Sequence, residues 1–428
     1  MVIKIPRHHI FEVYKAALLS VQGESRTHEW LKQCALNDSV SVVAIGKAAA
    51  SMMGGALSAL GPQLEAGLII TKTGHCEDGV DFESGSPVKS IQCFEAGHPI
   101  PDIRSLSAGM ELISFIERQP LSRTLVFLVS GGTSSLVESL PEGVSLTDLQ
   151  KLNEWMLASG LGIIALNNVR GIISCIKSGR LAKYINDRKA INLLISDVPG
   201  DAPHVVGSGL LSANPDLKKS FPAVLKSTLS NHDTPKWLNQ LAVNTEQAPL
   251  ATDACFNSID THVIATIADA KGAAASAAST FGYEVILHEE LIHGDAVVTG
   301  KQLAHELCHS RPGLHIWGGE TTVCLPENPG RGGRNQHLAL AAATALNGHK
   351  NCWLLAAGTD GSDGPTTDAG GLVDGETLAR GISSGLDAEL ALAEASSGEF
   401  LAVTNDLIRT GPTGTNVMDL VFGLKIQS

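Results

Sequence analysis

Residues 124–135 read TLVFLVSGGTSS, a run of strand-forming apolar residues that passes directly into a loop of glycines and hydroxyls. The same order recurs in SVVAIGKAAASMM (41–53), AINLLISDVPGD (190–201) and NCWLLAAGTDGSDG (351–364). Apolar runs that alternate with helical patterns are typical of parallel strands covered on both faces. Ligands of such sheets bind at the carboxyl ends of the strands, where these polar loops fall. The sequence therefore predicts an α/β fold with one composite site.

The length of the chain, 428 residues, exceeds one ordinary hydrophobic core, so we expect two domains. The polar and irregular stretch 216–252 predicts their connection, which gives domains 1–240 and 241–428. The net charge of −13, without a dense Lys/Arg cluster, argues against a nucleic-acid partner. The sequence contains no run long and apolar enough for a membrane span and no signal-peptide core. We therefore expect a cytoplasmic protein with small-molecule partners and leave a homodimer open as its assembly.

The eight cysteines are scattered along the chain and form no CxxC pair. This spacing favours reduced thiols over a zinc site or a disulfide framework. It also agrees with a cytoplasmic location.

Three glycine-containing loops are candidate anion sites. Ser130–Ser135 offers backbone N–H groups and hydroxyls after a buried run, and Gly46-Lys47 places a lysine at a strand-to-helix turn. Arg334 lies in GRGGRNQ (330–336), just before a helical pattern, where an arginine can bind a phosphate or carboxylate through two N–H groups. Each loop also has a plain explanation: a solvated lysine at a helix start for Lys47, a serine-rich turn for Ser130–Ser135, and an arginine that neutralises the Asp-rich loop for Arg334.

Paired carboxylates follow two of the apolar runs. Asp197 and Asp201 bracket a Pro-Gly turn, and Asp360 and Asp363 lie in the glycine-rich loop that follows residue 358. Such oxygens suit Mg²⁺ or a general base, although each carboxylate can equally cap a helix or stabilise a turn. The combination of a lysine, an arginine, glycine loops and aspartates matches phosphoryl transfer, which depends mostly on positioning and charge neutralisation. The sequence has no GxGxxG fingerprint of a nicotinamide site.

Two helices are predicted between the candidate loops. One begins after Ser145, with Ser145 as N-cap and Asp148 three residues on. The other is expected over 167–185, with Arg170, Lys177 and Arg180 on one broad face.

Together these loops resemble the class II glycerate kinases, the family with a C-terminal MOFRL domain. The matching stretches include AIGKAA, EAGHPIPD, VSGGTSSL, ISDVPGD, GGRNQ and TGPTGTNVMDL, in family order and over nearly the whole chain. Members phosphorylate D-glycerate at the 2-hydroxyl with ATP and Mg²⁺. The resemblance implies an N-terminal Rossmann-like doubly wound parallel sheet and a C-terminal α/β domain with the MOFRL region at about 312–424. It also implies an active site in the cleft between the two domains.

The resemblance assigns roles to individual residues. The family's expected catalytic pair falls on Lys47 and Arg334, and we add Asp197 as base or metal ligand. Asp360 and Asp363 are expected to bind the metal or to hold Arg334 in place. The expected substrate- or nucleotide-binding residues are Gly46, His98, Ser130, Gly131, Gly132, Thr133, Ser134, Arg170, Asp201, Glu320, Gly332, Gly333, Asn335 and Thr413.

Three other functions stay open beside a glycerate 2-kinase. One is an NAD(P)H-dependent hydroxypyruvate reductase, a second is a kinase for a related hydroxy or sugar acid, and a third is a non-catalytic sugar-acid sensor. The second gains weight from Thr133, which stands where the family usually has glycine. The absence of a dinucleotide fingerprint weighs against the reductase.

Overall fold

A computed structural model describes residues 4–34, 36, 38–76, 90–158, 168–171, 173–218, 237 and 247–427. The chain divides into two compact units, which we call the parallel-sheet unit (Gly23–Ala265) and the mixed-sheet unit (Met1–Gln22 with Thr266–Ser428). The boundaries of these units differ from the division at 240/241 expected from the sequence. The predicted connection at 216–252 lies partly outside the described residues.

The parallel-sheet unit contains six parallel strands. They are β1 (Val40–Ile45), β2 (Leu64–Lys72), β3 (Ser90–Ala96), β4 (Thr124–Val129), β5 (Ala190–Ile195) and β6 (Ile259–Ala265). Their order is β3-β2-β1-β4-β5-β6, with every neighbouring pair parallel. This is the strand order of a doubly wound Rossmann sheet, and the predicted fold is confirmed. Its topological switch point lies between β1 and β4, where ligands of such sheets bind.

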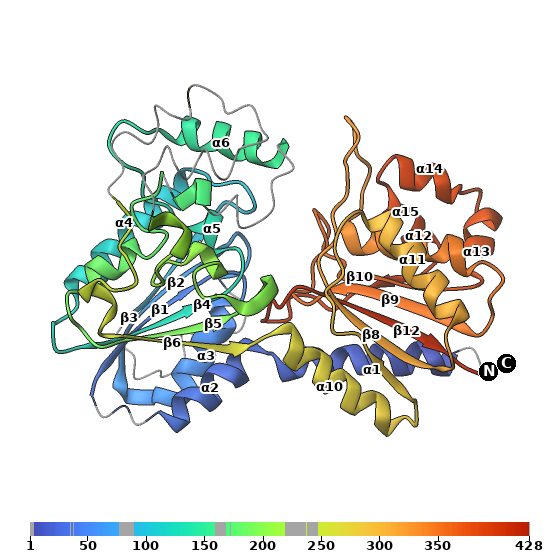
Figure 1. Cartoon of the computed structure of the whole chain (residues 1–428), viewed down its shortest axis with the longest axis horizontal. Helices are drawn as coiled ribbons and strands as arrows, with labels where there is room; N and C mark the ends of the chain where they lie inside the picture. Colours follow the sequence, from blue (N-terminus) through green and yellow to red (C-terminus); the bar gives the residue numbers. More distant parts are fainter. Residues whose placement is uncertain are drawn as a thin grey trace. The chain divides into compact units, whose positions relative to one another are not determined.

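Helices cover both faces of the parallel sheet. On one face α3 (Ala49–Leu60) packs on β1, β2 and β4, with α2 (Gly23–Gln33) against it; on the other, α4 (Ile103–Arg118) contacts β2 and β3 (Figure 1). Further helical segments among the described residues include α5 (Thr133–Leu136), α6 (Leu146–Ala158), η1 (Gly61–Gln63), η2 (Arg180–Ile185), η3 (Pro199–Asp201), η4 (Val206–Ser208), η5 (Pro215–Lys218) and η6 (Ala254–Phe256). β1, β4 and β5 are buried along their whole length, which explains their uninterrupted apolar sequences.

The two predicted helices of this unit have different outcomes. α6 begins as predicted: Asp148 N–H donates to Ser145 Oγ at 3.2 Å, and Ser145 N–H donates to Asp148 Oδ2 at 2.9 Å. The continuous helix expected over 167–185 is wrong. Ser178 and Gly179 adopt positive φ angles of 55° and 84° there, and η2 begins only at Arg180. Lys177 and Arg180 are buried, so their charges do not lie on a solvated helix face.

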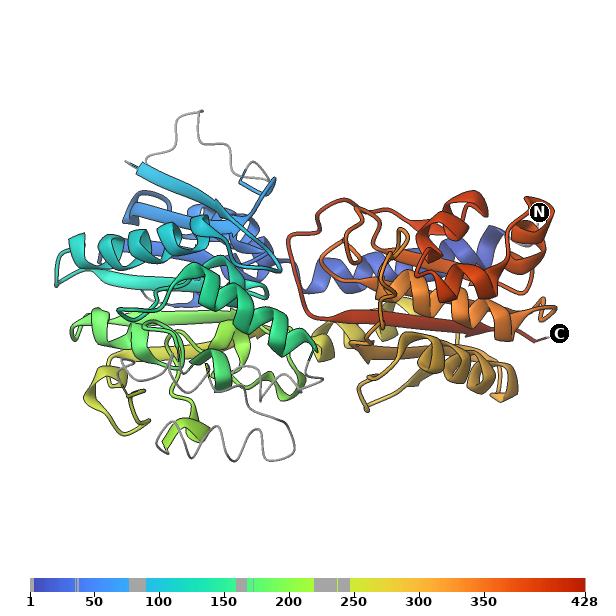
Figure 2. The ribbon, with the colours of Figure 1, turned by 90° about the horizontal axis from the view of Figure 1, so that it is seen from above.

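The mixed-sheet unit contains β7 (Val285–Leu287), β8 (Gly313–Gly319), β9 (Cys352–Gly358), β10 (Gly370–Asp374), β11 (Leu407–Ile408) and β12 (Asp419–Lys425), in the order β11-β10-β9-β12-β8-β7. The expectation of parallel pairing is wrong for most of this sheet. β7 and β8 are parallel, whereas the other neighbouring pairs are antiparallel. Two of these antiparallel pairs arise because β12, the last strand of the chain, inserts between β8 and β9 and runs opposite to both (Figure 2).

This insertion creates the edge where the predicted site residues of the unit gather. Because β8 and β9 both run antiparallel to β12, their carboxyl ends lie at the same edge as the start of β12. Asp419 pairs in register with Gly319 of β8 and with Gly358 of β9. The loops that begin with Glu320 and with Thr359 therefore leave the sheet beside Asp419.

Helices also cover both faces of the mixed sheet. α1 (Lys4–Ser20) and α10 (Ile267–Thr280) pack on one face, and α11 (Ala296–His309) and α12 (Arg334–Leu346) on the other (Figure 1). α13 (Thr377–Ser383), α14 (Ala388–Ala393) and α15 (Ser397–Val403) complete the unit. Among the described residues, no helix is both long and apolar enough to cross a bilayer.

The N-terminal helix belongs to the mixed-sheet unit because its side chains bond there. The buried hydroxyl of Tyr14 donates to the carbonyl of Gly358 at 2.6 Å. Arg7 donates to Asp374 at 2.7 Å and to Asp406 at 2.8 Å. These contacts join residues more than 300 positions apart in the sequence.

The expectation of reduced thiols is wrong for one pair of cysteines. Cys76 and Cys93 form a disulfide, with their Cα atoms 6.1 Å apart. β2 and β3 are neighbouring parallel strands, which brings Cys76, just past the end of β2, near Cys93 of β3. The other six cysteines are free thiols.

Candidate functional site

The turn after β1 packs so closely on the loop after β4 that only glycine fits at position 46. Gly46 has a φ of 125°, and a Cβ added there would lie 2.2 Å from Ser130 Oγ. The Gly46 carbonyl accepts from Thr71 Oγ1 at 3.0 Å, and Lys47 N–H donates to the Gly131 carbonyl at 2.9 Å. The backbone that carries Lys47 is therefore fixed on both sides.

The Ser130–Ser135 loop uses several of its hydroxyls to hold its own shape. Ser130 Oγ accepts from Ala48 N–H at 3.1 Å, and Thr133 Oγ1 directs its single proton to the carbonyl of Ser130 or of Ile45, at 2.7 and 3.1 Å. Ser134 Oγ lies 2.7 Å from Ser208 Oγ. The sequence predicted hydroxyl donors for an anion here, but the buried hydroxyls of Ser130 and Thr133 bond within the fold.

Gly132 brings Lys47 and His98 together. Its φ is 88°, and a Cβ added there would lie 3.1 Å from His98 Cδ2 and 3.2 Å from Lys47 Cγ. His98 follows β3, Lys47 follows β1 and Gly132 follows β4, so the three come from three strand ends. This convergence lies at the switch point where the Rossmann topology predicts a ligand.

Asp197 and Asp201 lie beyond the end of β5, at the same edge of the sheet. Asp201 adopts a positive φ of 53° at the end of η3. Its Oδ1 atom is buried and, within the described part of the chain, has no hydrogen-bond partner. Because buried polar atoms in folded proteins are almost always bonded, this oxygen is a fitting position for a cation or a substrate hydroxyl.

A buried ion pair holds the Ser130–Ser135 loop in place through a hydrogen bond to its backbone. Lys177 Nζ lies 2.5 Å from Glu138 Oε2 and donates to the Ser134 carbonyl at 2.6 Å. Glu138 Oε1 accepts from Ser174 Oγ at 2.5 Å. Burial lowers the pKa of Lys177, while the carboxylate of Glu138 opposes that shift. Burial also lowers the pKa of the nearby Arg170, a predicted binding residue, and Glu138 again opposes the shift.

In the mixed-sheet unit, Arg334 is the first residue of α12 and is fixed by two carboxylates. Its Nε and Nη2 donate to the two oxygens of Asp419 at 2.6 and 3.0 Å, and its Nη1 pairs with Glu320. Burial by itself lowers the pKa of Arg334, but Asp419 and Glu320 more than reverse this and raise it. A guanidinium has five N–H donors, so these contacts leave donors for a substrate anion.

Asp363, predicted as a metal ligand, caps the same helix. Its oxygens accept from the backbone N–H groups of Asn335 and Gln336 at 3.0 and 2.8 Å. Burial raises the pKa of Asp363 to about 7, although these N–H donors oppose the shift. Gly333 lies so close that a Cβ there would be 2.3 Å from Asp363 Cγ. The geometry favours a capping role for Asp363 that orients Arg334.

The other predicted residues of this unit shape the same edge of the sheet. Asp360 Oδ1 accepts from Ser362 N–H at 3.0 Å and from its hydroxyl at 3.1 Å. Thr413 Oγ1 donates to the Thr359 carbonyl at 2.5 Å. A Cβ on Gly332 would lie 2.6 Å from Ser397 Oγ. Asp360 is half-buried, so it remains the better placed of the two predicted metal ligands.

Sequence reasoning missed three residues that hold the candidate site in place. Asp419 fixes Arg334, while Lys177 and Glu138 support the Ser134 loop. Asp419 lies in TGPTGTNVMDL, and Lys177 lies in NNVRGIISCIKSGRLA (167–182), a further stretch that resembles the family. The signal was an ionisable residue inside an otherwise apolar segment, where a buried charge requires a partner.

The fit at Gly46 gives a testable prediction for the stability of the parallel-sheet unit. Gly46→Ala should lower the free energy of unfolding by at least about 3 kcal/mol, because it adds an unfavourable φ to a steric overlap with Ser130. Gly61→Ala is the matched control, since Gly61 also has a positive φ of 51° but no atom within 4 Å of its added Cβ. We expect it to cost about 1–2 kcal/mol, measured for both variants by amide hydrogen exchange of β1 and β4. Equal losses in the two variants would contradict the close contact at Gly46.

The fold and these side chains define a two-unit α/β protein with a lysine loop and an arginine loop at strand carboxyl ends, as a phosphotransferase requires. A family model described as a domain of unknown function, DUF4147, matches residues 9–242. The model of the MOFRL family matches residues 313–419.

Full-length relatives agree with these matches. The chain is 34% identical to a D-glycerate 2-kinase of Thermotoga maritima, over 96% of this chain and 97% of that protein. It is 33% identical to a putative hydroxypyruvate reductase of Agrobacterium vitis, over 89% and 85% of the two chains. The crystal structure of a glycerate kinase from Thermotoga maritima superposes with a TM-score of 0.82 at 33% identity, covering 99% of this chain and 100% of that one. The chain therefore belongs to the glycerate 2-kinase family with a C-terminal MOFRL domain.

Proposed function

We propose that this protein transfers the γ-phosphoryl group of ATP to the 2-hydroxyl of D-glycerate, giving 2-phosphoglycerate and ADP. The observation that carries the proposal is Arg334, a permanently charged guanidinium whose orientation is fixed by the buried Asp419. The T. maritima relative, named D-glycerate 2-kinase, supports the choice of substrate.

In this proposal the cations of the site bind and neutralise the anions of the reaction. Lys47 and Arg334 contact the substrate carboxylate or the phosphates and stabilise the charge of the transferring phosphoryl group. The N–H groups of the Ser130–Ser135 loop bind a further anionic group. Gly132 leaves room for Lys47 and His98 to approach the same ligand. Asp197 is the proposed base that receives the hydroxyl proton, or a metal ligand.

The carboxylates fit Mg²⁺, the metal expected for this family. Mg²⁺ prefers oxygen ligands and is usually bound through one or two carboxylates together with substrate phosphates. The unpaired buried Oδ1 of Asp201 is such an oxygen, and Asp197 and Asp360 are half-buried beside the strand ends. When bound, Mg²⁺ would neutralise charge on the phosphate oxygens.

A second candidate function is reduction of hydroxypyruvate, favoured by the name of the A. vitis relative. A dinucleotide site of this fold requires glycines in a GxGxxG turn after the first strand. The turn after β1 reads GKAAAS instead. The structure of this turn therefore favours the kinase.

The assay that tests the proposal combines ATP, Mg²⁺ and D-glycerate with purified protein. We expect ADP release and a product identified as the 2-phosphate by phosphorus NMR, whereas Lys47→Ala should lose most of the rate and remain folded. A parallel assay follows NADH oxidation with hydroxypyruvate. Turnover in that assay, without ADP formation from ATP and D-glycerate, would identify the protein as the reductase and not the kinase. Tartronate and other hydroxy acids test acceptor choice, which Thr133 can alter. Binding without turnover of any acceptor would favour the sensor.

We further propose a cytoplasmic location, since ATP is the phosphoryl donor. Cell fractionation tests this location. The assembly is tested by sedimentation of the purified chain, where a mass of one chain would exclude the homodimer.

A further inference from the structure

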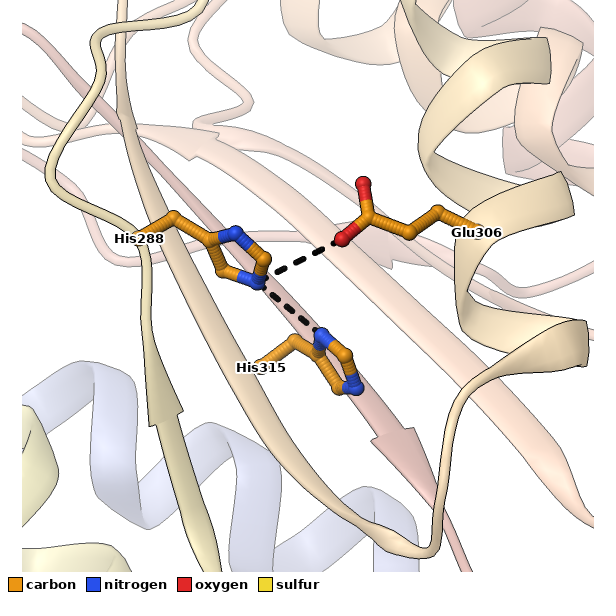
Figure 3. Close-up of side chains that lie close together, drawn as sticks. All are labelled: His288, Glu306 and His315. Carbon is orange, nitrogen blue, oxygen red and sulfur yellow. Dashed lines mark hydrogen bonds and ion pairs between the residues drawn. The ribbon is translucent and has the colours of Figure 1, made fainter.

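Three ligand-type side chains converge in the mixed-sheet unit, outside the candidate active site. His288 follows β7, His315 is the third residue of β8 and Glu306 lies on α11 (Figure 3). His288 Nε2 lies 3.0 Å from His315 Nδ1 and 3.7 Å from Glu306 Oε1. One ligand atom from each of the three residues lies within 4.8 Å of the other two.

We propose that His288, His315 and Glu306 form a binding site for a divalent transition-metal ion, with Zn²⁺ as the preferred ion. Two imidazoles and one carboxylate are a common ligand set for zinc, with a water molecule in the fourth position. Ligand atoms about 2.0–2.1 Å from a tetrahedral zinc lie about 3.3 Å from one another. The two distances from His288 Nε2, 3.0 and 3.7 Å, bracket this value.

A hydrogen bond at His315 Nε2, the ring nitrogen that faces away from His288, fixes the orientation of the ring for metal binding. Ser310 Oγ directs its single proton to the carbonyl of Leu307 or of Arg311, at 2.9 and 3.1 Å. It therefore accepts a hydrogen bond from His315 Nε2–H at 2.9 Å. The lone pair of His315 then lies on Nδ1, which faces His288. Such partners of a ligating histidine fix its tautomer and orientation.

The surroundings also fix His288 and keep both rings neutral. The His288 ring stacks on Trp317, with centroids 4.5 Å apart and planes at 18°, and Lys271 Nζ donates to the His288 carbonyl. Burial lowers the pKa of His315 to about 4 and also lowers the pKa of His288. Neutral imidazole is the form that binds metal. Metal binding would replace the hydrogen bond between the two rings, with the proton of His288 moving to Nδ1.

The site joins three successive elements of the mixed-sheet unit. His288 directly follows β7, Glu306 lies near the end of α11 and His315 lies inside β8. We assign the ion a structural role, because an ion bound to the folded state alone stabilises it. This inference does not depend on the proposed kinase activity.

The test uses the full-length protein without an affinity tag, stripped with a chelator and dialysed against Zn²⁺. We expect about one zinc per chain by mass spectrometry and, with Co²⁺, the intense visible absorption of a tetrahedral site. Zinc should raise the thermal midpoint of the stripped protein. Glu306→Gln should weaken zinc binding by about tenfold or more. The reason is that losing only a hydrogen-bond partner of a metal ligand already lowers metal affinity by about that factor. Glu306 is half-exposed, so this variant should remain folded.

The control variant is His305→Ala, on the same helix. His305 and His309 are exposed, lie with their ring centroids 4.2 Å apart and are a competing surface pair for a metal. Zinc content and the thermal shift should persist in His305→Ala and be lost in His288→Ala and Glu306→Gln. Zinc lost in His305→Ala but kept in Glu306→Gln overturns the proposal. A wild-type zinc content well below one per chain overturns it as well.

Discussion

Replacing Arg334 with alanine should lower kcat for D-glycerate phosphorylation by about a thousandfold or more. An arginine that stabilises the charge of a transferring phosphoryl group contributes about 10³–10⁵ in kcat. Arg334 is suited to that role because Asp419 orients its Nε and Nη2 while Nη1 reaches the exposed Glu320. A substrate anion can therefore replace Glu320 without disturbing the bond to Asp419. Steady-state kinetics with D-glycerate and ATP measures the loss.

Two further variants separate a catalytic role from a structural one. Arg334→Lys keeps the charge beside the buried Asp419 but loses the planar pair of donors, so kcat should recover only in part. Arg331→Ala removes the arginine three residues earlier, which pairs with the buried Asp368 at 2.8 Å. Asp368 also pairs with Arg409, so Arg331→Ala should stay folded and keep nearly full activity. Equal losses of kcat in Arg331→Ala and Arg334→Ala would contradict a specific role for Arg334.

The parallel-sheet half of the molecule was predictable because its strands and loops are local in sequence. TLVFLVSGGTSS contains its strand, its turn and the start of α5, and the glycines of GKAA and SGGTSS mark where two loops touch. Buried parallel strands carry an uninterrupted apolar signal. The carboxyl-edge rule then placed Lys47, Ser130 and Asp197 at one end of the sheet, as the structure does.

The mixed sheet was less predictable because its pairing is set at long range. The run 351–364 has the same local signature as 124–135, yet its strand pairs antiparallel with β12, more than 60 residues later. No local pattern distinguishes the two cases. The bond between Arg334 and Asp419 spans 85 residues and exists only because β12 inserts beside β8. The amphipathic pattern of α1 likewise does not show which sheet it covers.

Interior polar residues were the second source of error. The sequence predicts Lys177 on the broad basic face of a helix, whereas its ammonium is buried against Glu138. A lysine is rarely fully buried unless it is paired. The positive φ angles of Ser178 and Gly179 that turn the chain inward carry a weak signal, the dipeptide Ser-Gly. Lys177, in the same segment, donates to the Ser134 carbonyl. Because the helix prediction was wrong, the sequence did not show that this residue holds the candidate site in place.

Glu138→Ala should destabilise the parallel-sheet unit by about 3–5 kcal/mol, the usual result of removing one partner of a buried ion pair. The ammonium of Lys177, which is 1% exposed, would lose its counterion. Ser174 Oγ and the backbone N–H of Ser139 would also lose an acceptor. Because the chain has two units, amide hydrogen exchange of β4 and β5 is the suitable measurement. Glu117→Ala, which removes an exposed carboxylate of α4 in the same unit, should change little.

The pH dependence distinguishes the loss of a charge partner from the loss of packing. In the folded variant the pKa of Lys177 should lie below its unfolded value, since burial already lowers it in the presence of Glu138. The unfolded chain then binds more protons between these two pKa values, so the stability of the variant rises with pH in that interval. The deficit relative to wild type should therefore be smaller at pH 9 than at pH 6. A deficit independent of pH would show that a cavity, and not the unpaired ammonium, destabilises the variant. Replacing both partners, as Glu138→Leu with Lys177→Met, should restore much of the stability, because well-packed apolar side chains can replace a buried pair.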